Sequence, residues 1–248
     1  EDTFIMVGAI SDVGNLRNVN EDYLDYYVCD KYQLYIIADG MGGHNAGDIA
    51  SKICVQKIRE YINKNYDEED VKNMLVNAVK CANTAIYFKS LDNKKYKGMG
   101  TPLTFAFVCD GKIYVVNVGD SCFFVIKDNS VTKITKDHSL VQQLIDSGVL
   151  TQDEAKEHPN KNIITRSVGV NQSVDADMFL LDKDNDSYYL LCTDGLIDDI
   201  SYSEIAPYVT KNKESLDKAC SELVTLAKER GGRDNVSLII FGGTNNDR

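Results

Sequence analysis

The sequence has no hydrophobic run that approaches the roughly 18–20 residues needed to span a membrane. It also has no cluster of Lys or Arg, and its 27 basic and 38 acidic residues give a net charge of −11. Because binding to a nucleic-acid backbone depends on basic residues, this balance argues against a nucleic-acid partner. The segment Glu1–Thr3 has neither the basic region nor the apolar core of a secretion signal. We therefore expect a cytoplasmic protein with no nucleic-acid and no membrane partner.

The cysteines and prolines indicate a single domain whose thiols are reduced. The seven cysteines form an odd set without CxxC spacing, and most lie within apolar runs. We expect them to be reduced thiols in the core rather than disulfides or zinc ligands. Three prolines, no Ser/Gly-rich stretch and no repeat leave no evident linker. A chain of 248 residues can bury a large core, so we expect a single domain over 1–248.

Hydrophobic periodicity predicts a mixture of strands and helices. Apolar runs predict strands at 4–10, 23–29, 33–38, 103–109, 112–118, 121–127, 131–135, 175–182, 188–192 and 235–241. Apolar residues spaced three and four apart predict helices at 46–62, 71–86, 139–148, 151–157 and 215–229. The fourth helix begins with a capping box formed by Thr151 and Glu154.

Short turns between successive strands predict antiparallel pairs. Asp110-Gly111 between two apolar runs is a strong hairpin signal. We predict further hairpins around 127–129 and around 183–187. Because the strands meander while the helices occur in groups, the sequence predicts an α+β layered fold rather than alternating βαβ units.

Four aspartates lie at the ends of apolar strands, beside or close to glycine: Asp39, Asp120, Asp194 and Asp234. Any one of them alone is more typical of a plain turn, because Asp-Gly is a common turn pair. If antiparallel order brings these ends to one edge of the sheet, the four carboxylates need cations to neutralise them. Oxygen ligands without nearby His or Cys favour Mg²⁺ or Mn²⁺ over Zn²⁺. The Gly40 carbonyl is a further candidate ligand, because glycine allows close approach of the backbone.

The segment GNLRNVNED places Arg17 four residues before Glu21 and Asp22. An arginine near carboxylates usually forms a salt bridge, and for Arg17 taken alone this role is favoured over phosphate binding. Its planar guanidinium also matches a pair of phosphate oxygens, which makes Arg17 a candidate phosphate ligand.

These residues lie within a series of motifs that resembles the metal-dependent Ser/Thr protein phosphatases (the PPM family, protein phosphatase type 2C), in their compact bacterial branch. The matching segments are SDVGNLRNVNED, ADGMGGHNAGDIAS, KGMGT, VGDS, TKDHSLVQQL, NIITRSVG, CTDGLIDDI and GGRDNVSLII. They follow the family's order and spacing across essentially the whole chain. The resemblance implies a four-layer α-β-β-α sandwich of two antiparallel sheets flanked by helices, with a small flap subdomain at 139–163 that influences the choice of substrate.

The resemblance also implies roles for the candidate residues in a site for two Mn²⁺ or Mg²⁺ ions. Asp39 would bridge the two ions, with the Gly40 carbonyl on one of them. Asp194 and Asp234 would bind the other ion. Glu21 would be a ligand, directly or through water, of the ion that Gly40 binds.

Further residues match the surroundings of those two ions. Asp22 would orient metal-bound waters, and Arg17 matches the phosphate-binding arginine. Asp120 together with Asp194 matches a third metal site that binds weakly, and Asp198 is a further candidate for that site.

The implied reaction is hydrolysis of phosphoserine or phosphothreonine in proteins by a water that bridges two divalent ions. The resemblance implies phosphoprotein substrates and a cognate Ser/Thr kinase that the enzyme opposes in signalling, and we expect a monomer. Two alternatives remain: a catalytically silent, metal-binding regulatory module on the same fold, and a hydrolase of small phosphate esters. The silent module would be expected to have lost at least one of Asp39, Asp194, Asp234 and Arg17, and all four are present.

We expect the three histidines to have structural rather than catalytic roles. Some family members place a general-acid histidine directly after the Asp-Gly pair, but this chain has Met41 there. We expect a hydrogen-bonded loop role for His44. His138 and His158 are expected to be structural and to hold the ends of the flap.

Two further positions depart from the family's usual motifs. Pro102 stands where relatives show the last threonine of GMGTT, and Cys122 stands where they show the arginine of GDSR. We expect local changes only, because proline is tolerated at the first residue of a strand and neither position is a proposed ligand. Any ion pair made by that arginine would be absent.

Overall fold

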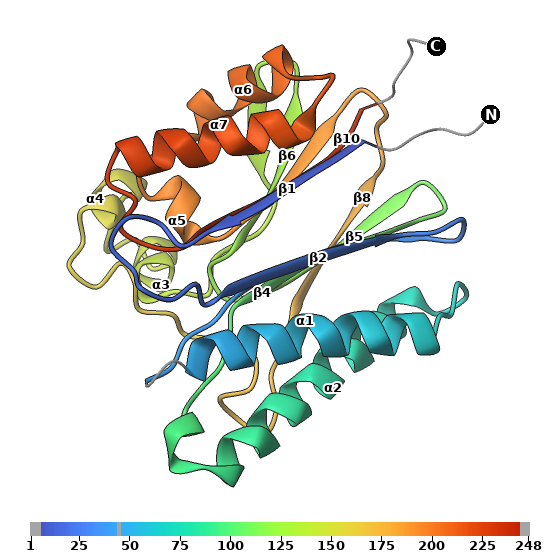
Figure 1. Ribbon diagram of the computed structural model, residues 1–248, viewed down its shortest axis with the longest axis vertical. Helices are drawn as coiled ribbons and strands as arrows, with labels where there is room; N and C mark the ends of the chain where they lie inside the picture. The colour runs from blue at the N-terminus through green and yellow to red at the C-terminus, as the bar shows by residue number, and fades with distance from the viewer. Residues whose placement is uncertain (1–5, 44–45, 244–248) are drawn as a thin grey trace.

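The computed structural model describes residues 6–43 and 46–243 and contains two five-stranded antiparallel sheets (Figure 1). One sheet has the order β1-β10-β9-β6-β7 and the other has the order β2-β3-β4-β5-β8. The strands are β1 Met6–Asp12, β2 Asp22–Val28, β3 Gln33–Asp39, β4 Leu103–Cys109, β5 Lys112–Val118, β6 Cys122–Lys127, β7 Ser130–Lys133, β8 Asp177–Asp182, β9 Tyr188–Cys192 and β10 Val236–Gly242. The helices are α1 Ala46–Lys64, α2 Val71–Asp92, α3 Leu140–Asp146, α4 Gln152–Lys156, α5 Asp194–Ile197, α6 Ile205–Lys211 and α7 Leu216–Glu229, with 3₁₀ turns at Lys94–Tyr96 and Tyr202–Glu204.

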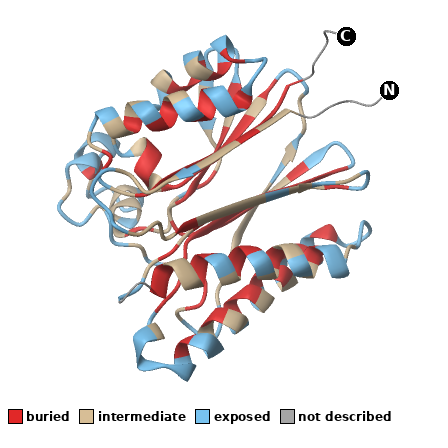
Figure 2. Cartoon of the chain, in the orientation of Figure 1, coloured by how far each residue is buried: buried red, intermediate tan, exposed pale blue. Residues whose placement is uncertain are grey.

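The two sheets face each other, and helices cover their outer faces, which makes four layers. Helices α1 and α2 lie against the β2-β3-β4-β5-β8 sheet, and α6 and α7 lie against the other sheet (Figure 1). Between the sheets, Tyr35 of β3 stacks on Phe241 of β10 with ring centroids 3.8 Å apart. Figure 2 shows buried residues along the strands and on the helix faces turned toward them. The predicted α-β-β-α sandwich is confirmed.

Local sequence explains where several elements begin and turn. At the start of α4, the Thr151 hydroxyl accepts a hydrogen bond from the Glu154 amide, and the Glu154 carboxylate accepts one from the Thr151 amide, so the predicted capping box is confirmed. In the β4–β5 hairpin, Asp110 and Gly111 both have positive φ, at 47° and 68°. The predicted hairpin around 127–129 is also present as the β6–β7 pair.

The predicted hairpin around 183–187 is wrong. β8 is an edge strand that pairs with β5, whereas β9 lies in the other sheet between β10 and β6. The residues of β9 are almost all buried, and the strand needs neighbours on both sides. The turn-like segment therefore carries the chain from one sheet to the other. Helices α5 and α6 were also missing from the prediction.

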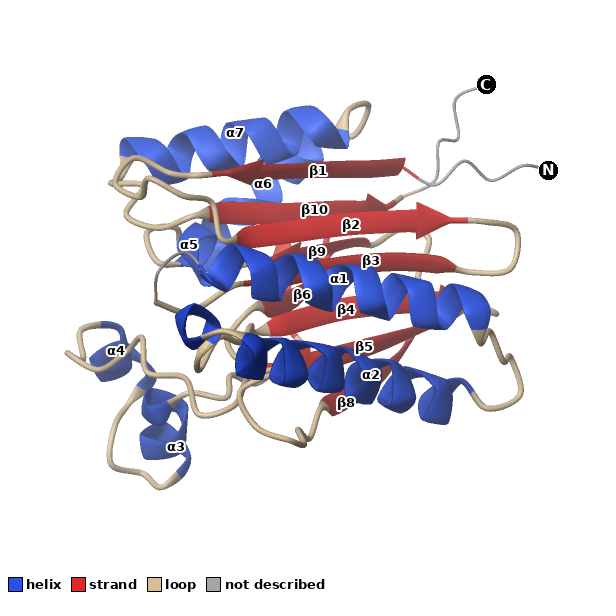
Figure 3. Ribbon diagram, turned by 60° about the horizontal axis from the view of Figure 1, so that its bottom comes forward, coloured by secondary structure: helices blue, strands red, loops and turns tan. Residues whose placement is uncertain are grey.

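A segment outside the four layers carries α3 and α4 (Figure 3). The predicted strand at 4–10 is present from Met6 onward, and its first two residues lie outside the described residues. All seven cysteines fall in the described ranges and are free thiols, five of them buried. No helix in those ranges has the length and apolar character needed to cross a membrane.

Candidate metal centre

Three of the predicted aspartates come together at one end of the sandwich. Carboxylate oxygens of Asp39, Asp120 and Asp194 lie within 4.8 Å of one another. Asp39 ends β3, Asp120 follows β5, and Asp194 follows β9, so the cluster draws on both sheets. The strand pattern predicts that these ends meet at one edge of a single sheet. The convergence is confirmed for three of the four aspartates, but two facing sheets produce it.

Asp22 lies directly opposite Asp39 in the antiparallel β2–β3 pair. Its Oδ2 accepts hydrogen bonds from the Ser237 hydroxyl at 2.6 Å and the Thr193 hydroxyl at 3.0 Å. Ser237 lies on β10 and Thr193 directly follows β9, and both strands belong to the other sheet. The Asp22 side chain therefore links the two sheets by hydrogen bonds. No pattern in the sequence singles out these two hydroxyls, although both lie in motifs that contain a predicted ligand.

Asp234 lies beside Asp194 because Gly195 packs directly against the start of β10. A Cβ on Gly195 would lie 2.1 Å from the Asn235 carbonyl oxygen and 3.6 Å from the Asp234 Cβ. No side chain fits there, so glycine at 195 lets the two aspartates approach. Arg17 Nε lies 3.3 Å from Asp234 Oδ1, and the Arg17 side chain is 54% exposed. The arginine therefore reaches the carboxylate cluster with its guanidinium open to solvent.

Glu21 and Gly40 meet at the start of α1. The Gly40 amide donates to the Glu21 carbonyl at 2.9 Å, and a Cβ on Gly40 would lie 1.8 Å from the Gly47 carbonyl oxygen. The Gly47 amide donates to the Glu21 carboxylate, and a Cβ on Gly47 would lie 2.7 Å from that carboxylate. The backbone of Gly40 is therefore packed closely against that of Gly47, and the role of the Gly40 carbonyl as a metal ligand stays a prediction.

The loop that carries Arg17 and Glu21 is held by Asn235, a residue to which the sequence analysis gave no role. The Asn235 amide group donates to the carbonyls of Val13 at 2.9 Å and Val19 at 3.1 Å. Its oxygen accepts from the Glu21 amide at 2.9 Å. Asn235 is buried and directly follows Asp234 in sequence, which is the signal that could have identified it.

The clustered carboxyls hold their protons more tightly than free carboxyls do. Loss of hydration raises the pKa of Asp22 and of Asp194 to about 6 each, with repulsion from Asp234 adding to both. The same loss of hydration, followed by repulsion from neighbouring carboxylates, places the pKa of Asp39 and of Asp120 well above the usual range. For Glu21, desolvation raises the pKa and the charge of Arg17 partly opposes it.

Two carboxylate oxygens in this cluster point to cation binding. Asp194 Oδ1 and Asp22 Oδ1 are buried and have no hydrogen-bond partner among the described residues. Unpaired buried carboxylate oxygens are costly unless a proton or a cation satisfies them. Because the donors are oxygens and the cluster contains no Cys or His, the residues fit a hard divalent ion such as Mg²⁺ or Mn²⁺.

Asp198 lies one helical turn after Asp194, at the end of α5. The residue is exposed, yet nearby protein atoms desolvate its carboxyl and, with the charge of Asp194, raise its pKa to about 7. Asp198 therefore shares the electrostatic field of the cluster from its outer side.

His138 has the anchoring position expected for it, whereas His158 makes only a local hydrogen bond within the 139–163 segment. His138 Nδ1 accepts from the Gly119 amide at 2.9 Å, so its Nε2 carries the proton and donates to Asp177 Oδ2 at 2.8 Å. The Thr165 amide donates to the His138 carbonyl at 2.9 Å, which ties together the two ends of the 139–163 segment. His158 Nδ1 accepts from the Asn160 amide within that segment. His44 lies outside the described residues.

The two departures from the usual motifs have local consequences. Pro102 lies just before β4, and its carbonyl accepts from the Asp39 amide at 3.1 Å. Cys122 is fully buried, and its Sγ lies 3.9 Å from Asp137 Oδ1. Lys133 Nζ pairs with that same carboxylate at 2.7 Å, so a lysine from the neighbouring strand supplies the cation there.

The fold and the carboxylate cluster define the class of a metal-dependent phosphatase, and comparison with known proteins agrees. The sequence profile described as "Protein phosphatase 2C" matches residues 17–228. Protein phosphatase PhpP of Streptococcus pneumoniae is 34% identical over 244 residues, covering 97% of this chain and 98% of PhpP. Serine/threonine phosphatase stp of Listeria welshimeri is 32% identical over 234 residues, covering 93% and 92%.

Solved structures of bacterial phosphatases resemble this chain in fold and sequence. The Streptococcus agalactiae serine/threonine phosphatase has a TM-score of 0.90 at 32% identity, covering 97% of this chain and 100% of that one. The catalytic domain of the serine/threonine protein phosphatase PstP, solved in complex with two manganese ions, has a TM-score of 0.84 at 31% identity, covering 96% and 97%. The chain belongs to the protein phosphatase 2C family. The family assignment predicted from the motifs is confirmed.

Proposed function

We propose that this chain is a protein phosphatase that hydrolyses phosphoserine and phosphothreonine with two divalent metal ions, Mn²⁺ or Mg²⁺. The observation that carries the proposal is the cluster of Asp39, Asp120 and Asp194 carboxylates, with a buried Asp194 oxygen that has no partner in the described ranges. When bound, the two ions would lower the pKa of a coordinated water and supply a hydroxide-like nucleophile near neutral pH.

The chain's own residues have separate tasks in this proposal. Asp39 would hold both ions, the Gly40 carbonyl and Glu21 would bind one of them, and Asp194 and Asp234 would bind the other. Because Arg17 reaches the cluster with an exposed guanidinium, it binds the phosphoryl oxygens of the substrate and offsets their charge.

The remaining acidic residues surround that centre. Asp22, fixed by two hydroxyls, orients water at the metals. Asp120 and Asp194, with Asp198 as a further candidate, would hold a third and weaker ion. The single domain includes a flap at 139–163 whose two ends are tied at His138 and Thr165, and this flap influences which substrates bind.

The cellular setting follows from the same activity. We infer a cytoplasmic signalling enzyme that acts as a monomer on phosphoproteins and opposes a cognate Ser/Thr kinase. A phosphoprotein approaches a chain of net charge −11, so attraction has to be local to the metals and Arg17.

The first experiment measures phosphate release from a phosphothreonine peptide by the purified chain with millimolar Mn²⁺, with Mg²⁺, and with EDTA. We expect turnover with Mn²⁺ that EDTA abolishes. A folded protein that releases no phosphate under any of these conditions would instead be a silent regulatory module. Hydrolysis of metabolite phosphates in preference to phosphopeptides would indicate a hydrolase of small phosphate esters.

A further inference from the structure

Helix α2 and the 3₁₀ turn Lys94–Tyr96 that follows it carry a charge opposite to that of the rest of the protein. Residues 71–97 contain six lysines and one aspartate, a net charge of +5, whereas the remaining residues sum to −16. The negative charge of the whole chain conceals this local reversal. The expectation that the chain has no cluster of basic residues is therefore wrong for this segment, to which the proposed function gives no role.

Two exposed apolar side chains lie among these lysines. Phe88 and Leu91 are 59% and 63% exposed, and a spacing of three places them on one face of α2, one turn apart. The exposed Lys80 lies on that face as well, since residues 80, 84, 88 and 91 follow the helical repeat. Figure 2 shows exposed residues along the outward side of α2. The 3₁₀ turn packs on the end of the helix. We call the surface formed by Lys80, Phe88, Leu91, Lys94, Lys95 and Lys97 the α2 face.

The lysines of the α2 face form no ion pair in the part of the chain that the structure describes. Most other basic residues in the described ranges are paired, as Lys127 is with Asp184 at 2.7 Å. Like charges that lie close together repel one another, and an anionic partner would relieve this repulsion. The charge of the α2 face is therefore available to a partner.

The backbone that carries these lysines is fixed. Asn93 Oδ1 accepts a hydrogen bond from the Lys95 amide at 2.9 Å, and the Asn93 carbonyl accepts from the Tyr96 amide at 2.9 Å. The Tyr96 ring packs against the hydrophobic core under α2, with Lys89 Nζ 5.7 Å from the ring centroid. The Met99 amide donates to the Tyr96 carbonyl at 3.1 Å. A partner therefore meets a preformed surface, which favours affinity.

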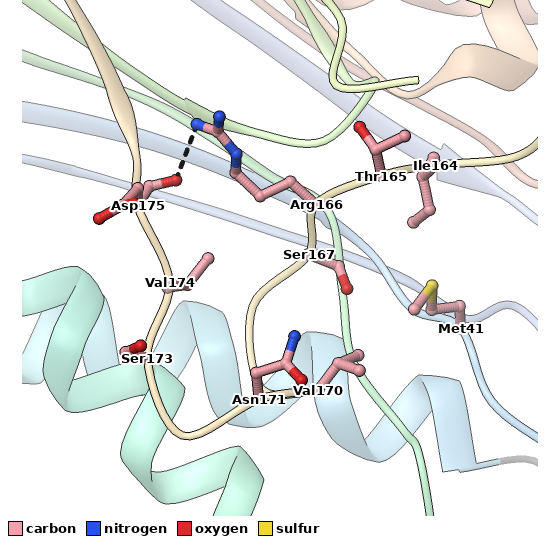
Figure 4. Close-up of a pocket in the computed structure, with 10 residues that line it drawn as sticks. All are labelled: Met41, Ile164, Thr165, Arg166, Ser167, Val170, Asn171, Ser173, Val174 and Asp175. Carbon is pink, nitrogen blue, oxygen red and sulfur yellow. Dashed lines mark hydrogen bonds between the residues drawn. The ribbon is translucent and has the colours of Figure 1, made fainter. Parts of the chain in front are cut away.

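The same segment leads directly to the candidate metal centre. Gly100 and Met41, which is drawn in Figure 4, exchange two backbone hydrogen bonds at 2.9 Å and 3.1 Å, and Met41 follows Gly40. Lys97 comes three residues before Gly100. The dimensions of an extended chain and of an antiparallel pair therefore place the Cα of Lys97 within about 20 Å of that of Gly40. An extended peptide covers this distance with about six residues, so a bound phosphoprotein can reach the α2 face.

The surroundings of the α2 face favour a narrow acidic partner over an extended one. Residues 67–70, directly before α2, are four consecutive exposed acidic residues. An anionic membrane is a plane that would also approach those carboxylates, whereas a peptide can contact the α2 face alone. Exposed aromatic and apolar side chains such as Phe88 and Leu91 commonly anchor protein interfaces. The chemistry therefore fits an acidic peptide segment that contains an apolar side chain.

We propose that the α2 face docks an acidic segment of the phosphoprotein substrate, with an apolar side chain in it, while the phosphorylated residue occupies the metal centre. The proposal rests on the proposed function, because it assigns a second contact to the same substrates. It narrows the substrate class to phosphoproteins with an acidic stretch about six to ten residues from the phosphorylated Ser or Thr. Attraction of such proteins to a chain of net charge −11 then has a second local source besides the metals and Arg17.

The test uses phosphothreonine peptides in which the sequence Glu-Glu-Leu-Glu-Glu lies about eight residues before or after the phosphothreonine, joined by a Gly/Ser spacer. Matched peptides carry Ser in place of this sequence, or carry it directly beside the phosphothreonine. In one orientation we expect kcat/KM for the distant acidic sequence to exceed both controls about tenfold at low salt, through a lower KM, since several exposed ion pairs act together. The advantage should shrink in about 0.5 M NaCl, because salt screens exposed charges.

A double charge reversal tests the lysines. Lys94→Glu combined with Lys95→Glu should remove the advantage and leave turnover of the Ser peptide and of p-nitrophenyl phosphate unchanged. Lys213→Glu combined with Lys218→Glu is the matched control, because both lysines are exposed and the net charge changes by the same amount. This control should keep the advantage.

The apolar part and the binding step are tested separately. Phe88→Ala should lower the advantage about threefold because less apolar area is buried, whereas Leu180→Ala, at a 48% exposed leucine of β8, should not change it. A fluorescent Glu-Glu-Leu-Glu-Glu peptide without phosphate measures docking independently of turnover. It should bind the wild type at least about tenfold more tightly than the variant with Lys94→Glu and Lys95→Glu.

Four results would decide against parts of this account. Equal kcat/KM for all phosphopeptides would reject the α2 face and leave the proposed function intact. Loss of the advantage in both double variants would show that net charge, rather than the α2 face, is responsible. Hydrolysis of no phosphopeptide would reject the proposed function, and binding of the unphosphorylated peptide would then still decide whether the α2 face accepts an acidic segment. Binding to phosphatidylserine vesicles without binding to the peptide would replace the acidic protein with an anionic membrane.

Discussion

Asp22 and Asp39 face each other directly across the β2–β3 pair, at the end where both strands reach the candidate metal centre. Two carboxylates in direct opposition on neighbouring strands destabilise a sheet. One oxygen of Asp22 is held by two hydroxyls, and its other oxygen is buried without a partner in the described part of the chain. A divalent cation at this point would offset the repulsion. Metal binding should therefore stabilise the folded protein.

Removing a proposed ligand should separate activity from folding. We expect Asp194→Ala to lower phosphatase turnover by at least about a hundredfold, because it removes both a metal ligand and the buried oxygen that has no partner. The far-UV spectrum should be unchanged, and the metal-free variant should melt no lower than the metal-free wild type, since a repelled carboxylate is gone.

Asp186→Ala is the control for this change, because Asp186 is an exposed aspartate in the 183–187 loop. It should retain normal turnover and normal metal dependence. Near-normal turnover of Asp194→Ala would contradict the metal-site assignment.

The stability of the metal-free protein should fall as pH rises from about 5 to 8. The pKa values of Asp22 and Asp194 are raised to about 6 and that of Asp198 to about 7, so the folded state binds more protons than the unfolded state in this range. Stability from these groups is complete below their unfolded pKa, near 4, and is lost as pH passes through the folded values. The melting temperature in EDTA should drop by on the order of 5 °C over this interval.

The carboxyls of Asp184 and Glu204, whose pKa values are lowered to about 2, do not change charge between pH 5 and 8 and cannot mask this trend. Millimolar Mn²⁺ should flatten the pH dependence, because metal binding to the folded state replaces the protons. A melting temperature in EDTA that stays constant or rises from pH 5 to 8 would show that the carboxylate cluster does not carry this proton linkage.

Arg17 should act on substrate binding more than on chemistry. We expect Arg17→Ala to raise KM for a phosphopeptide about tenfold, as befits loss of a charge-assisted contact to phosphate. Arg233→Ala is a matched control, because Arg233 is 69% exposed and its nearest carboxylate oxygen lies 3.9 Å away, on Asp199. An unchanged KM in Arg17→Ala would leave the ion pair with Asp234 as the role of Arg17.

The two described histidines of the flap region should differ in their importance. His138→Ala removes hydrogen bonds to the Gly119 amide and to Asp177, and should destabilise the protein by about 1–3 kcal/mol. Limited proteolysis should then cut the 139–163 segment faster than in the wild type. His158→Ala removes one local hydrogen bond and should leave both the melting temperature and the rate of cleavage nearly unchanged. Equal effects of the two changes would contradict an anchoring role for His138.

Local sequence was sufficient for features that depend on neighbours along the chain. The Asp110-Gly111 turn was predictable because both residues must adopt positive φ, and the capping box at Thr151 was predictable because its hydrogen bonds span three residues. The ordered motifs also identified the family. Where each aspartate sits relative to its strand followed from hydrophobic periodicity alone.

Tertiary structure decided which strands pair and which side chains meet. The segment 183–187 resembles a hairpin turn, yet β8 and β9 enter different sheets, because burial on both faces of β9 depends on neighbours far away in sequence. Some hydrogen bonds join residues more than 80 positions apart, such as those from the Glu21 amide to Asn235 and from the Gly169 amide to Asn83. The sequence by itself determined the family, most of the strands and helices, and the candidate ligands. Only packing of the two sheets decided that those ligands converge, since no local pattern encodes distances between facing sheets.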